Sequence, residues 1–179
     1  EMGKSFRNEN IDRTHNPEFT MLEAYIAYKD YNYMMDLTEE LYEYVVRSLY
    51  GTTTITHDGH EISFARPWKR LTVKQALKEL ASIDVDALNS DELLAMADKT
   101  GKQVNRRVAG EAILVLFEEF CEEKLVQPTH IIDYPKESTV FAKLHRQDPQ
   151  LVERFESYIA GKEITNGYSE LNDPVLQRQ

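Results

Sequence analysis

The chain has 179 residues, of which 41% are hydrophobic and 29% are charged, and its formal net charge is −10. These values are typical of one globular domain with a real core, and the negative charge argues against a broad basic surface for DNA or RNA. The single cysteine, Cys121, cannot form an internal disulfide, and no apolar run approaches the roughly 18 residues of a membrane span. We therefore expect a cytoplasmic protein that has neither a membrane nor DNA as a partner.

The first 28 residues predict two strands joined by a polar loop, with Phe6-Arg7-Asn8-Glu9 on one side and His15-Asn16-Pro17 on the other. Side chains alternate between the two faces of a strand, so residues 18–26 have one chemically mixed face and one apolar face. The mixed face comprises Phe19, Met21, Glu23 and Tyr25, and the other, which we expect in the core, comprises Thr20, Leu22, Ala24 and Ile26.

The glutamate on the mixed face limits what this segment can do. A carboxylate among aromatic and thioether groups is costly to desolvate unless a cation meets it. Glu23 therefore indicates either a structural ion pair with an arginine or lysine, or a site for a nucleotide and a cation.

An amphipathic helix is predicted after these strands. Leu37, Leu41, Val45 and Leu49 recur at every fourth residue, and Gly51 stands where the helix is expected to end.

Further elements are predicted from local signals. Asp58-Gly59 predicts a tight hairpin turn, residues 72–75 form a capping box that starts a short helix, and Ser90 is expected to cap another helix. A long helix is predicted from Val108 to Lys124, in which Cys121 is a small core residue rather than a nucleophile.

Short strands are predicted in the last third of the chain, at residues 129–134, 154–160 and 162–171. Strands and helices follow one another without regular alternation, which favours an α+β fold with an antiparallel sheet flanked by helices. The sequence has no GxGxxG motif and no P-loop, so a nucleotide site would have to use side chains.

Two carboxylates are predicted to lie close together near the end of the chain. A two-residue turn at Ala160-Gly161 would place Glu156 diagonally opposite Glu163 across a hairpin. Their repulsion can be relieved by a proton, by a basic side chain such as Lys162, or by a divalent cation bound together with phosphate.

A second mixed face follows the turn. Asn166, Tyr168 and Glu170 share this face, and Gly167 stands between them where a larger side chain would obstruct a ligand. If both hairpins belong to one sheet, these residues and the pair Glu23 and Tyr25 would converge on a pocket suited to an ammonium group.

These runs resemble class II lysyl-tRNA synthetases over essentially the whole chain. Residues 6–25 are similar to the second signature motif of that family, and residues 154–156, 162–164 and 166–173 are similar to its downstream active-site strands. Aspartyl and asparaginyl relatives lack the combination of His-Asn-Pro-Glu-Phe-Thr with Asn-Gly-aromatic-Ser-Glu-Leu. The resemblance implies the class II synthetase fold, with motif strands at 1–28, a helical and hairpin insert at about 30–125, and active-site strands at about 129–173.

The side chains that the resemblance implies for ATP binding are Arg7, Glu9, His15, Asn16, Phe19 and Met21. Arg7, as the catalytic residue, would contact the α-phosphate and the lysine carboxylate, and Glu9 would meet the adenine amino group. His15 and Asn16 would meet phosphates and neighbouring nucleotide groups, while Phe19 would stack on adenine in a pocket that Met21 lines.

The side chains that the resemblance implies for lysine binding are Arg7, Glu23, Tyr25, Asn166, Tyr168 and Glu170, with Glu170 facing the ε-ammonium. Glu156 and Glu163 would hold Mg²⁺ against the phosphates. The implied activity is that of a lysine–tRNA ligase, which uses ATP to convert L-lysine into lysyl-adenylate and transfers the lysyl group to tRNA(Lys). The full-length protein is expected to be a homodimer.

Three departures from the family pattern are visible. Thr139-Val140 stands where the family usually has Ser-Pro, near the pocket. The chain begins after the first signature motif and ends before the third, and it lacks the anticodon-binding domain, so we expect this segment alone to be inactive or nearly so. Two alternatives stay open: a related enzyme that attaches a lysyl-type group to elongation factor P, and a non-catalytic binding module.

Overall fold

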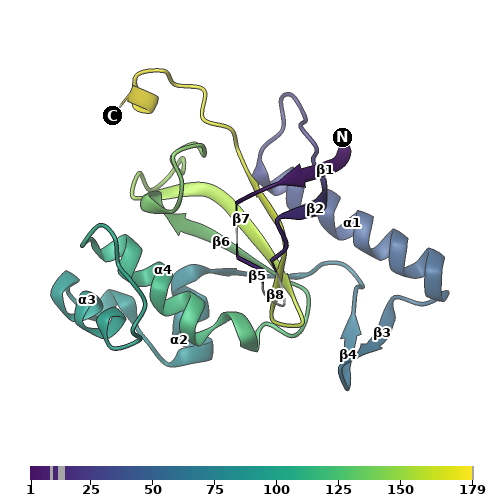
Figure 1. Ribbon diagram of the computed structural model, residues 1–179, viewed down its shortest axis with the longest axis horizontal. Helices are drawn as coiled ribbons and strands as arrows, with labels where there is room; N and C mark the ends of the chain where they lie inside the picture. The colour runs from purple at the N-terminus through teal and green to yellow at the C-terminus, as the bar shows by residue number, and fades with distance from the viewer. Residues whose placement is uncertain (9, 12–14, 179) are drawn as a thin grey trace.

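The computed structural model describes all residues except 9, 12–14 and 179 (Figure 1). Its strands are β1 (Met2–Phe6), β2 (Glu18–Leu22), β3 (Thr54–His57), β4 (His60–Ser63), β5 (Lys69–Thr72), β6 (Thr129–Pro135), β7 (Leu151–Ile159) and β8 (Lys162–Tyr168). Its α-helices are α1 (Tyr31–Tyr50), α2 (Val73–Ala81), α3 (Ser90–Asp98) and α4 (Ala109–Phe120). Short 3₁₀ turns lie at Val85–Ala87, Glu122–Lys124, Lys136–Ser138 and Leu176–Arg178. Among the described helices, none is long and apolar enough to cross a membrane.

The centre of the fold is a four-stranded sheet with the order β5-β6-β7-β8. β6, β7 and β8 are antiparallel neighbours, and β5 pairs in parallel with β6. The expected α+β fold is therefore confirmed, with one parallel pair at the edge of the sheet. β5 was not predicted because its four residues include only one large apolar side chain, Leu71, and lack a strand-like alternation.

Helices cover both faces of this sheet. Phe155 packs with Tyr31 and Met35 of α1, whereas Tyr158 belongs to the core that includes Phe117 of α4. Because residues 155 and 158 point to opposite faces of β7, α1 and α4 lie on opposite faces of the sheet. The larger core, on the α4 side, also receives α2 and α3.

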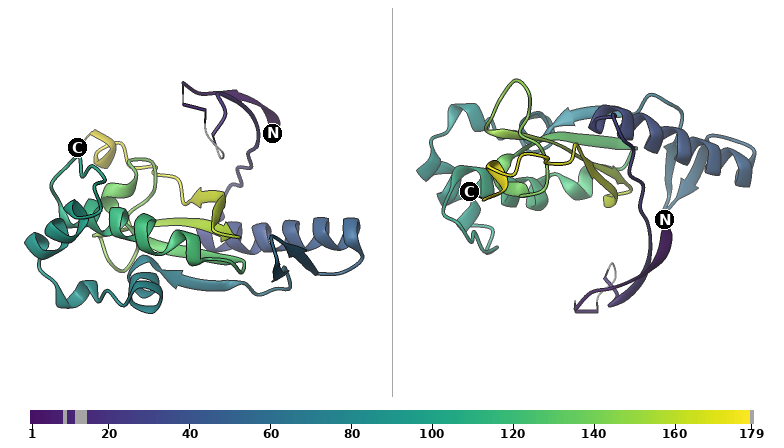
Figure 2. Two further views of the ribbon diagram at one scale, coloured as in Figure 1. Left: turned by 60° about the horizontal axis from the view of Figure 1, so that its bottom comes forward. Right: turned by 90° about the horizontal axis from the view of Figure 1, so that it is seen from above.

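The β1–β2 hairpin is a separate two-stranded sheet, so the condition that both hairpins belong to one sheet is not met. Figure 2 shows it standing off the body and joined to α1 by an extended segment. The expected core face of residues 20–26 is also wrong, because Leu22 is 60% exposed and Ile26 is 39% exposed. An isolated hairpin has no second layer to cover its apolar face.

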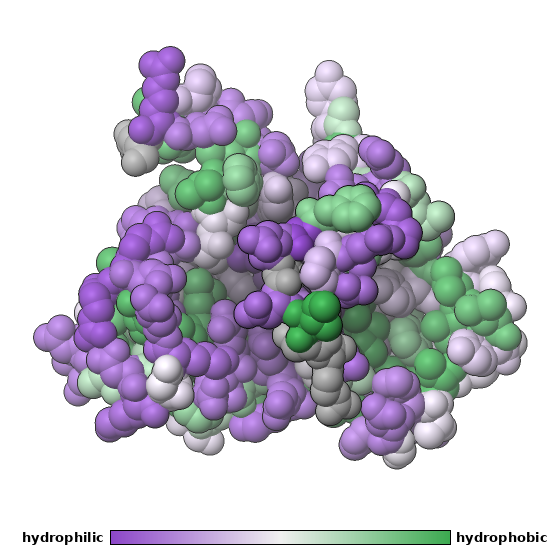
Figure 3. Space-filling view, in the orientation of Figure 1, coloured by the Kyte–Doolittle hydropathy of each residue, from purple (hydrophilic) through white to green (hydrophobic). Residues whose placement is uncertain are grey.

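Helix α1 begins and ends at clear signals, but it buries a face that the apolar repeat did not mark. The Asp30 carboxylate accepts from the amides of Asn32 and Tyr33, and Gly51 closes the helix at φ +71°. The predicted stripe is wrong at its outer positions, since Leu41, Val45 and Leu49 are exposed. Figure 3 shows hydrophobic residues at the surface on the right, where α1 lies. The sheet instead receives a face that includes the polar side chains Thr38 and Glu39, which periodicity of apolar residues cannot reveal.

Other local signals were largely reliable. Asp58 and Gly59 form the hairpin turn between β3 and β4, and the capping box of residues 72–75 starts α2. The cap of α3 is Asn89, which pairs with Glu92, and not Ser90 as expected. The long helix ends at Phe120 and continues only as a 3₁₀ turn, and Cys121 is fully buried as a core residue, with its thiol pKa raised to about 11 by burial.

Candidate functional site

The β1–β2 hairpin carries most of the predicted ATP-binding side chains. Phe19 and Met21 point to the same half-buried face, opposite Ser5 and Gly3 in the pairing register. The guanidinium carbon of Arg7 lies 5.2 Å from the centroid of the Phe19 ring, a cation–π distance. The structure therefore brings the predicted catalytic arginine and the predicted adenine-stacking ring together.

The loop of this hairpin is described only in part. Glu9, the predicted contact of the adenine amino group, lies outside the described residues. His15 and Asn16 are exposed, and the backbone amide of Arg7 donates to the Pro17 carbonyl oxygen at 2.9 Å. The hairpin ladder thus continues past β1 and fixes the backbone from which Arg7 projects.

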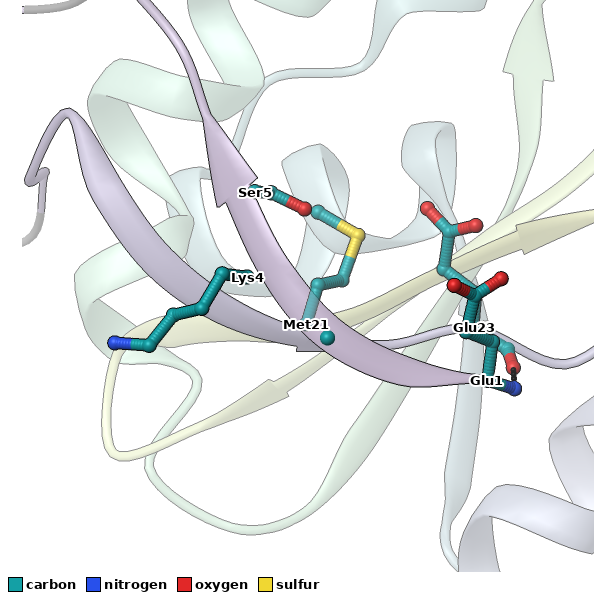
Figure 4. A pocket seen from close by; sticks show the side chains of 6 residues that line it. Glu1, Lys4, Ser5, Met21 and Glu23 are labelled. Atoms are coloured by element: carbon teal, nitrogen blue, oxygen red, sulfur yellow. Dashed lines mark hydrogen bonds between the residues drawn. The ribbon is translucent and has the colours of Figure 1, made fainter.

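A shallow hollow of about 110 Å³ follows the same hairpin (Figure 4). Met21 and Glu23 line it, together with Glu1, Gly3, Lys4 and Ser5 from the other side of the hairpin. The backbone nitrogen of Glu1 lies 2.7 Å from the Glu23 carbonyl oxygen, as the dashed line in Figure 4 shows. Ligand pockets usually enclose about 300 Å³ or more, so this hollow is too small to hold a nucleotide by itself.

A β-bulge shapes the second part of the site. β7 and β8 turn at Ala160-Gly161 as predicted, with Ile159 opposite Lys162 and Tyr158 opposite Glu163. The register then shifts by one residue, so Glu156 faces Asn166. Because side chains alternate in a strand, Glu163 and Asn166 would lie on opposite faces without this bulge. The bulge places both on the face of Glu156.

Glu156 is buried and has hydrogen-bond partners on both carboxylate oxygens. Tyr134 and Tyr158 donate their hydroxyls to Oε2 at 2.7 and 2.6 Å. On Oε1 the carboxylate accepts from the Arg154 guanidinium and, at 3.3 Å, from the Asn166 amide. An ionised carboxylate offers about four acceptor positions, and all of them are used here.

A third carboxylate continues this network. The Tyr158 hydroxyl lies 3.0 Å from Glu122 Oε1 and 2.6 Å from Glu156 Oε2, and it has one proton to donate to the two carboxylates. The hydroxyl thus lies between the two carboxylates, and burial raises the pKa of the Glu122 carboxyl while the hydrogen bond from Tyr158 lowers it.

The pKa of Glu163 is raised to about 7, first because its carboxyl is partly removed from water and second because the Glu156 carboxylate is near. The residue as a whole keeps contact with solvent. Lys162 does not relieve the repulsion as one alternative held, because its register with Ile159 places it on the other face of the sheet. Arg154 forms an ion pair with Glu156 instead.

Several of the predicted lysine-binding residues come near one another at Tyr168. Burial raises the pKa of the Tyr168 hydroxyl, and the negative charges of Glu170 and Glu23 raise it further. Glu23 and Tyr25 follow β2, whereas Glu170 follows β8, so the segments after two separate sheets act on one ring. Glu170 and Tyr25 are exposed, so the arrangement is open to solvent.

The expected role of Gly167 is wrong. A methyl group at this position would lie 2.5 Å from Phe155 Cε1, on the face of the sheet opposite to Tyr168. Gly167 therefore makes room for a buried aromatic ring and not for a ligand.

Within the described part of the chain, no three His, Cys, Asp or Glu side chains form a group that could hold a metal ion. Mg²⁺, however, is often held by only one or two carboxylates together with substrate phosphates. The hard oxygen donors of Glu163 and Glu156 fit that mode. Glu163 can offer its oxygens directly, whereas Glu156 has to release Arg154 or Asn166 to form a bond with a cation.

Sequence reasoning missed the side chains that hold Glu156. Arg154 and Tyr158 lie two residues before and after it, so strand alternation could have placed them on its face. Tyr134 and Glu122 come from other elements, and nothing in the local pattern links them to Glu156.

Comparisons with known proteins identify the family to which the chain belongs. The family described as tRNA synthetases class II (D, K and N) matches residues 1–179. Proteins named lysine–tRNA ligase from Clostridium novyi, Porphyromonas gingivalis and Methanoculleus marisnigri are 46%, 47% and 48% identical to the chain. The alignments cover 100%, 100% and 99% of the chain but 36%, 31% and 35% of those relatives. The chain thus spans about a third of the length of the curated relatives it matches, and it belongs to the class II tRNA synthetases of the D, K and N group.

Proposed function

We propose that the protein containing this chain is a lysine–tRNA ligase, the activity for which the relatives at 46–48% identity are named. The observation that carries the choice of amino acid is the pair of carboxylates, Glu23 and Glu170, whose charges act on Tyr168. Two carboxylates and aromatic walls suit the ε-ammonium of lysine, whereas an aspartate substrate would require an arginine. In the proposed site, Glu170 faces the ε-ammonium, and Glu23, Tyr25, Asn166 and Tyr168 complete the pocket.

The ATP site in this proposal lies along the β1–β2 hairpin. Phe19 and Met21 contact the adenine ring, and Arg7 bridges the α-phosphate and the lysine carboxylate. Because Arg7 already lies over one face of the Phe19 ring, adenine is expected to stack on the other face or to displace the guanidinium toward the phosphates. His15 and Asn16 meet the phosphates, and Glu9, outside the described residues, meets the adenine amino group.

The proposed first step needs positioning more than acid or base chemistry. A lysine carboxylate oxygen attacks the α-phosphorus in line, the bond from that phosphorus to the bridging oxygen breaks, and pyrophosphate leaves with the bond electrons. Arg7 stabilises the charge that develops on the α-phosphate. The terminal hydroxyl of the tRNA then takes the lysyl group, and AMP leaves.

Mg²⁺, when bound, would supply positive charge at the phosphates, and Glu163 and Glu156 are the residues that would hold it. Homodimer formation, a cytoplasmic location and the division into motif strands, insert and active-site strands stay predictions of the family resemblance.

Lysine-dependent exchange of pyrophosphate into ATP by the full-length protein tests this proposal, because it measures adenylate formation without tRNA. Glu170→Gln and Arg7→Ala should each lower kcat/KM for lysine by about 10- to 150-fold, the value of a hydrogen bond to a charged group. Glu61→Gln and Arg47→Ala, which change exposed residues away from the site, serve as matched controls.

Exchange supported by another amino acid, or full exchange in both site variants, would overturn the proposal. A protein that activates lysine but transfers it to elongation factor P and not to tRNA(Lys) would instead be the related modifying enzyme.

A further inference from the structure

Helix α1 meets the sheet through a row of buried polar side chains that the proposed reaction does not use. Nδ1 of His130 lies 2.9 Å from the Ser157 hydroxyl oxygen, and its Nε2 lies 3.2 Å from Glu39 Oε1. The order of serine, histidine and carboxylate matches that of a hydrolytic triad. His130 and Ser157 are 0% exposed and Glu39 is 3% exposed, so no substrate can reach them and the row is not a catalytic site.

The hydrogen bonds fix the imidazole in one orientation. Burial, and secondly the positive charge of Arg70, lower the pKa of His130 to about 3, so the ring is neutral. A carboxylate only accepts, so Nε2 carries the proton and donates to Glu39, and Nδ1 accepts from the Ser157 hydroxyl. The Arg70 guanidinium donates to the same Glu39 oxygen at 3.3 Å and keeps that carboxylate paired.

The fixed imidazole is part of an aromatic stack that ends beneath the candidate site. Trp68 stacks on His130 with 5.2 Å between ring centroids, and Phe155 meets His130 edge-to-face at 5.5 Å. The Phe155 ring lies so close to Gly167 that an added methyl group would approach it to 2.5 Å. The ring that contacts His130 therefore lies directly against the backbone of β8 at Gly167.

Gly167 lies between two of the proposed lysine-binding residues. Asn166 and Tyr168 are its neighbours in β8, and their side chains point to the face opposite Phe155. Helix α1 holds the next residue as well, because the amide of Tyr31 donates to the Ser169 hydroxyl at 3.2 Å. A shift of Phe155 would move this backbone and redirect Tyr168.

We propose that His130 is a positioning residue for the amino-acid pocket: held by Glu39 and Ser157, it fixes Phe155 beneath Gly167 and thereby directs Asn166 and Tyr168 toward the substrate. The inference rests on the proposed function for the identity of the substrate. The dependence of the Tyr168 orientation on His130 is expected whatever the substrate is.

The first test is a steric rescue measured by pyrophosphate exchange in the full-length protein. Gly167→Ala should raise the KM for lysine by about 10- to 100-fold, as expected for misplacing a substrate contact, while the KM for ATP changes by less than about twofold. Phe155→Leu removes the ring atoms that the new methyl group meets, so the double variant should recover most of the lysine KM. No recovery, or equal changes in both KM values, would overturn the inference.

The second test changes His130 itself. His130→Phe keeps a ring in the stack and loses both hydrogen bonds, whereas His130→Leu loses the ring as well, so the lysine KM should rise more for leucine than for phenylalanine. His60→Leu, at an exposed histidine of β4, is the matched control. If both His130 variants lower only kcat, with the ratio of the two KM values unchanged, the role is merely structural and the inference fails.

A readout without substrate separates this inference from the proposed function. The ¹⁹F resonance of a fluorotyrosine at position 168 should shift in His130→Phe and Gly167→Ala and stay in place in His60→Leu. A shift in a protein that shows no lysine-dependent exchange would reject the proposed function and retain the coupling. Exchange with an unshifted resonance would reject the coupling and retain the function.

Discussion

The two hairpins that carry the candidate site hold their charged side chains in opposite ways. In β7–β8, Glu156 is 8% exposed and accepts hydrogen bonds from Arg154, Asn166 and two tyrosine hydroxyls. In β1–β2, the ion pair between Lys4 and Glu18 lies open to water, with both side chains more than half exposed. One half of the site is thus fixed by the sheet and its helices, and the other half presents its polar groups to solvent.

The difference has a predictable energetic consequence. A buried charge that loses its partner keeps its desolvation cost, whereas an exposed charge is rehydrated when its partner is removed. The same chemical change should therefore cost much more in or beneath β7–β8 than in β1–β2.

The largest expected effect concerns the buried layer beneath β7–β8. Burial of His130 lowers its pKa from 6.5 to about 3. The unfolded chain therefore takes up a proton on this histidine near pH 6.5, while the folded chain does so only near pH 3. The free energy of unfolding should fall with decreasing pH across this window, by up to roughly 5 kcal/mol from this residue.

Urea unfolding between about pH 7 and pH 4 measures this slope. His130→Phe should remove the share of the slope that His130 contributes, and His60→Phe should leave the slope as it is. An unchanged slope in His130→Phe would show that the histidine is not buried in a neutral form.

A charge removed from each hairpin gives the next effect. Arg154→Met leaves the buried Glu156 carboxylate without its cation and should lower the free energy of unfolding by about 3–5 kcal/mol. Lys4→Met breaks the exposed pair with Glu18 and should cost less than about 1 kcal/mol. Equal losses in urea unfolding of the two variants would contradict the contrast between the hairpins.

A smaller difference is expected for a single hydroxyl. Tyr158→Phe removes one donor from Glu156 and the contact with Glu122, and should cost about 1–3 kcal/mol. Tyr25→Phe, at a side chain that is 81% exposed, should leave stability within about 0.5 kcal/mol. Thermal unfolding of the two variants checks the pair, and a stable Tyr158→Phe protein would mean that water replaces the lost hydroxyl.

The same contrast explains which parts of the molecule the sequence could predict. Turns and caps were found where one residue type has a local reason, as at Asp58-Gly59 and at the capping box of residues 72–75. Strand alternation and the family motifs marked the carboxylates and rings of the candidate site, and their roles stay predictions. The bulge after Ser157 was not found, because register depends on the partner strand as well as on the bulged segment.

Features that depend on packing between distant elements escaped prediction. The buried face of α1 contains Glu39, whose partners His130 and Arg70 lie in β6 and β5. The apolar repeat of Leu41, Val45 and Leu49 predicted that a different face of α1 is buried, because periodicity detects apolar residues and not buried ion pairs. Gly167 was expected to leave room for a ligand, because the local pattern does not show that the Phe155 ring of the neighbouring strand packs against it from the other face.

The smallest expected effect tests whether the β1–β2 hairpin, which is exposed in this chain, is also exposed in the full-length protein. Leu22 is 60% exposed, so Leu22→Ser should change the free energy of unfolding of this chain by less than about 0.5 kcal/mol. A loss of about 2 kcal/mol in this chain would contradict the exposed position of Leu22. Since the relatives are about three times as long as the chain, the same variant is measured in the full-length protein. A loss of unfolding free energy confined to the full-length protein would show that additional protein packs on this face of the β1–β2 hairpin. A small loss in both proteins would mean that this face stays open until the ligands bind.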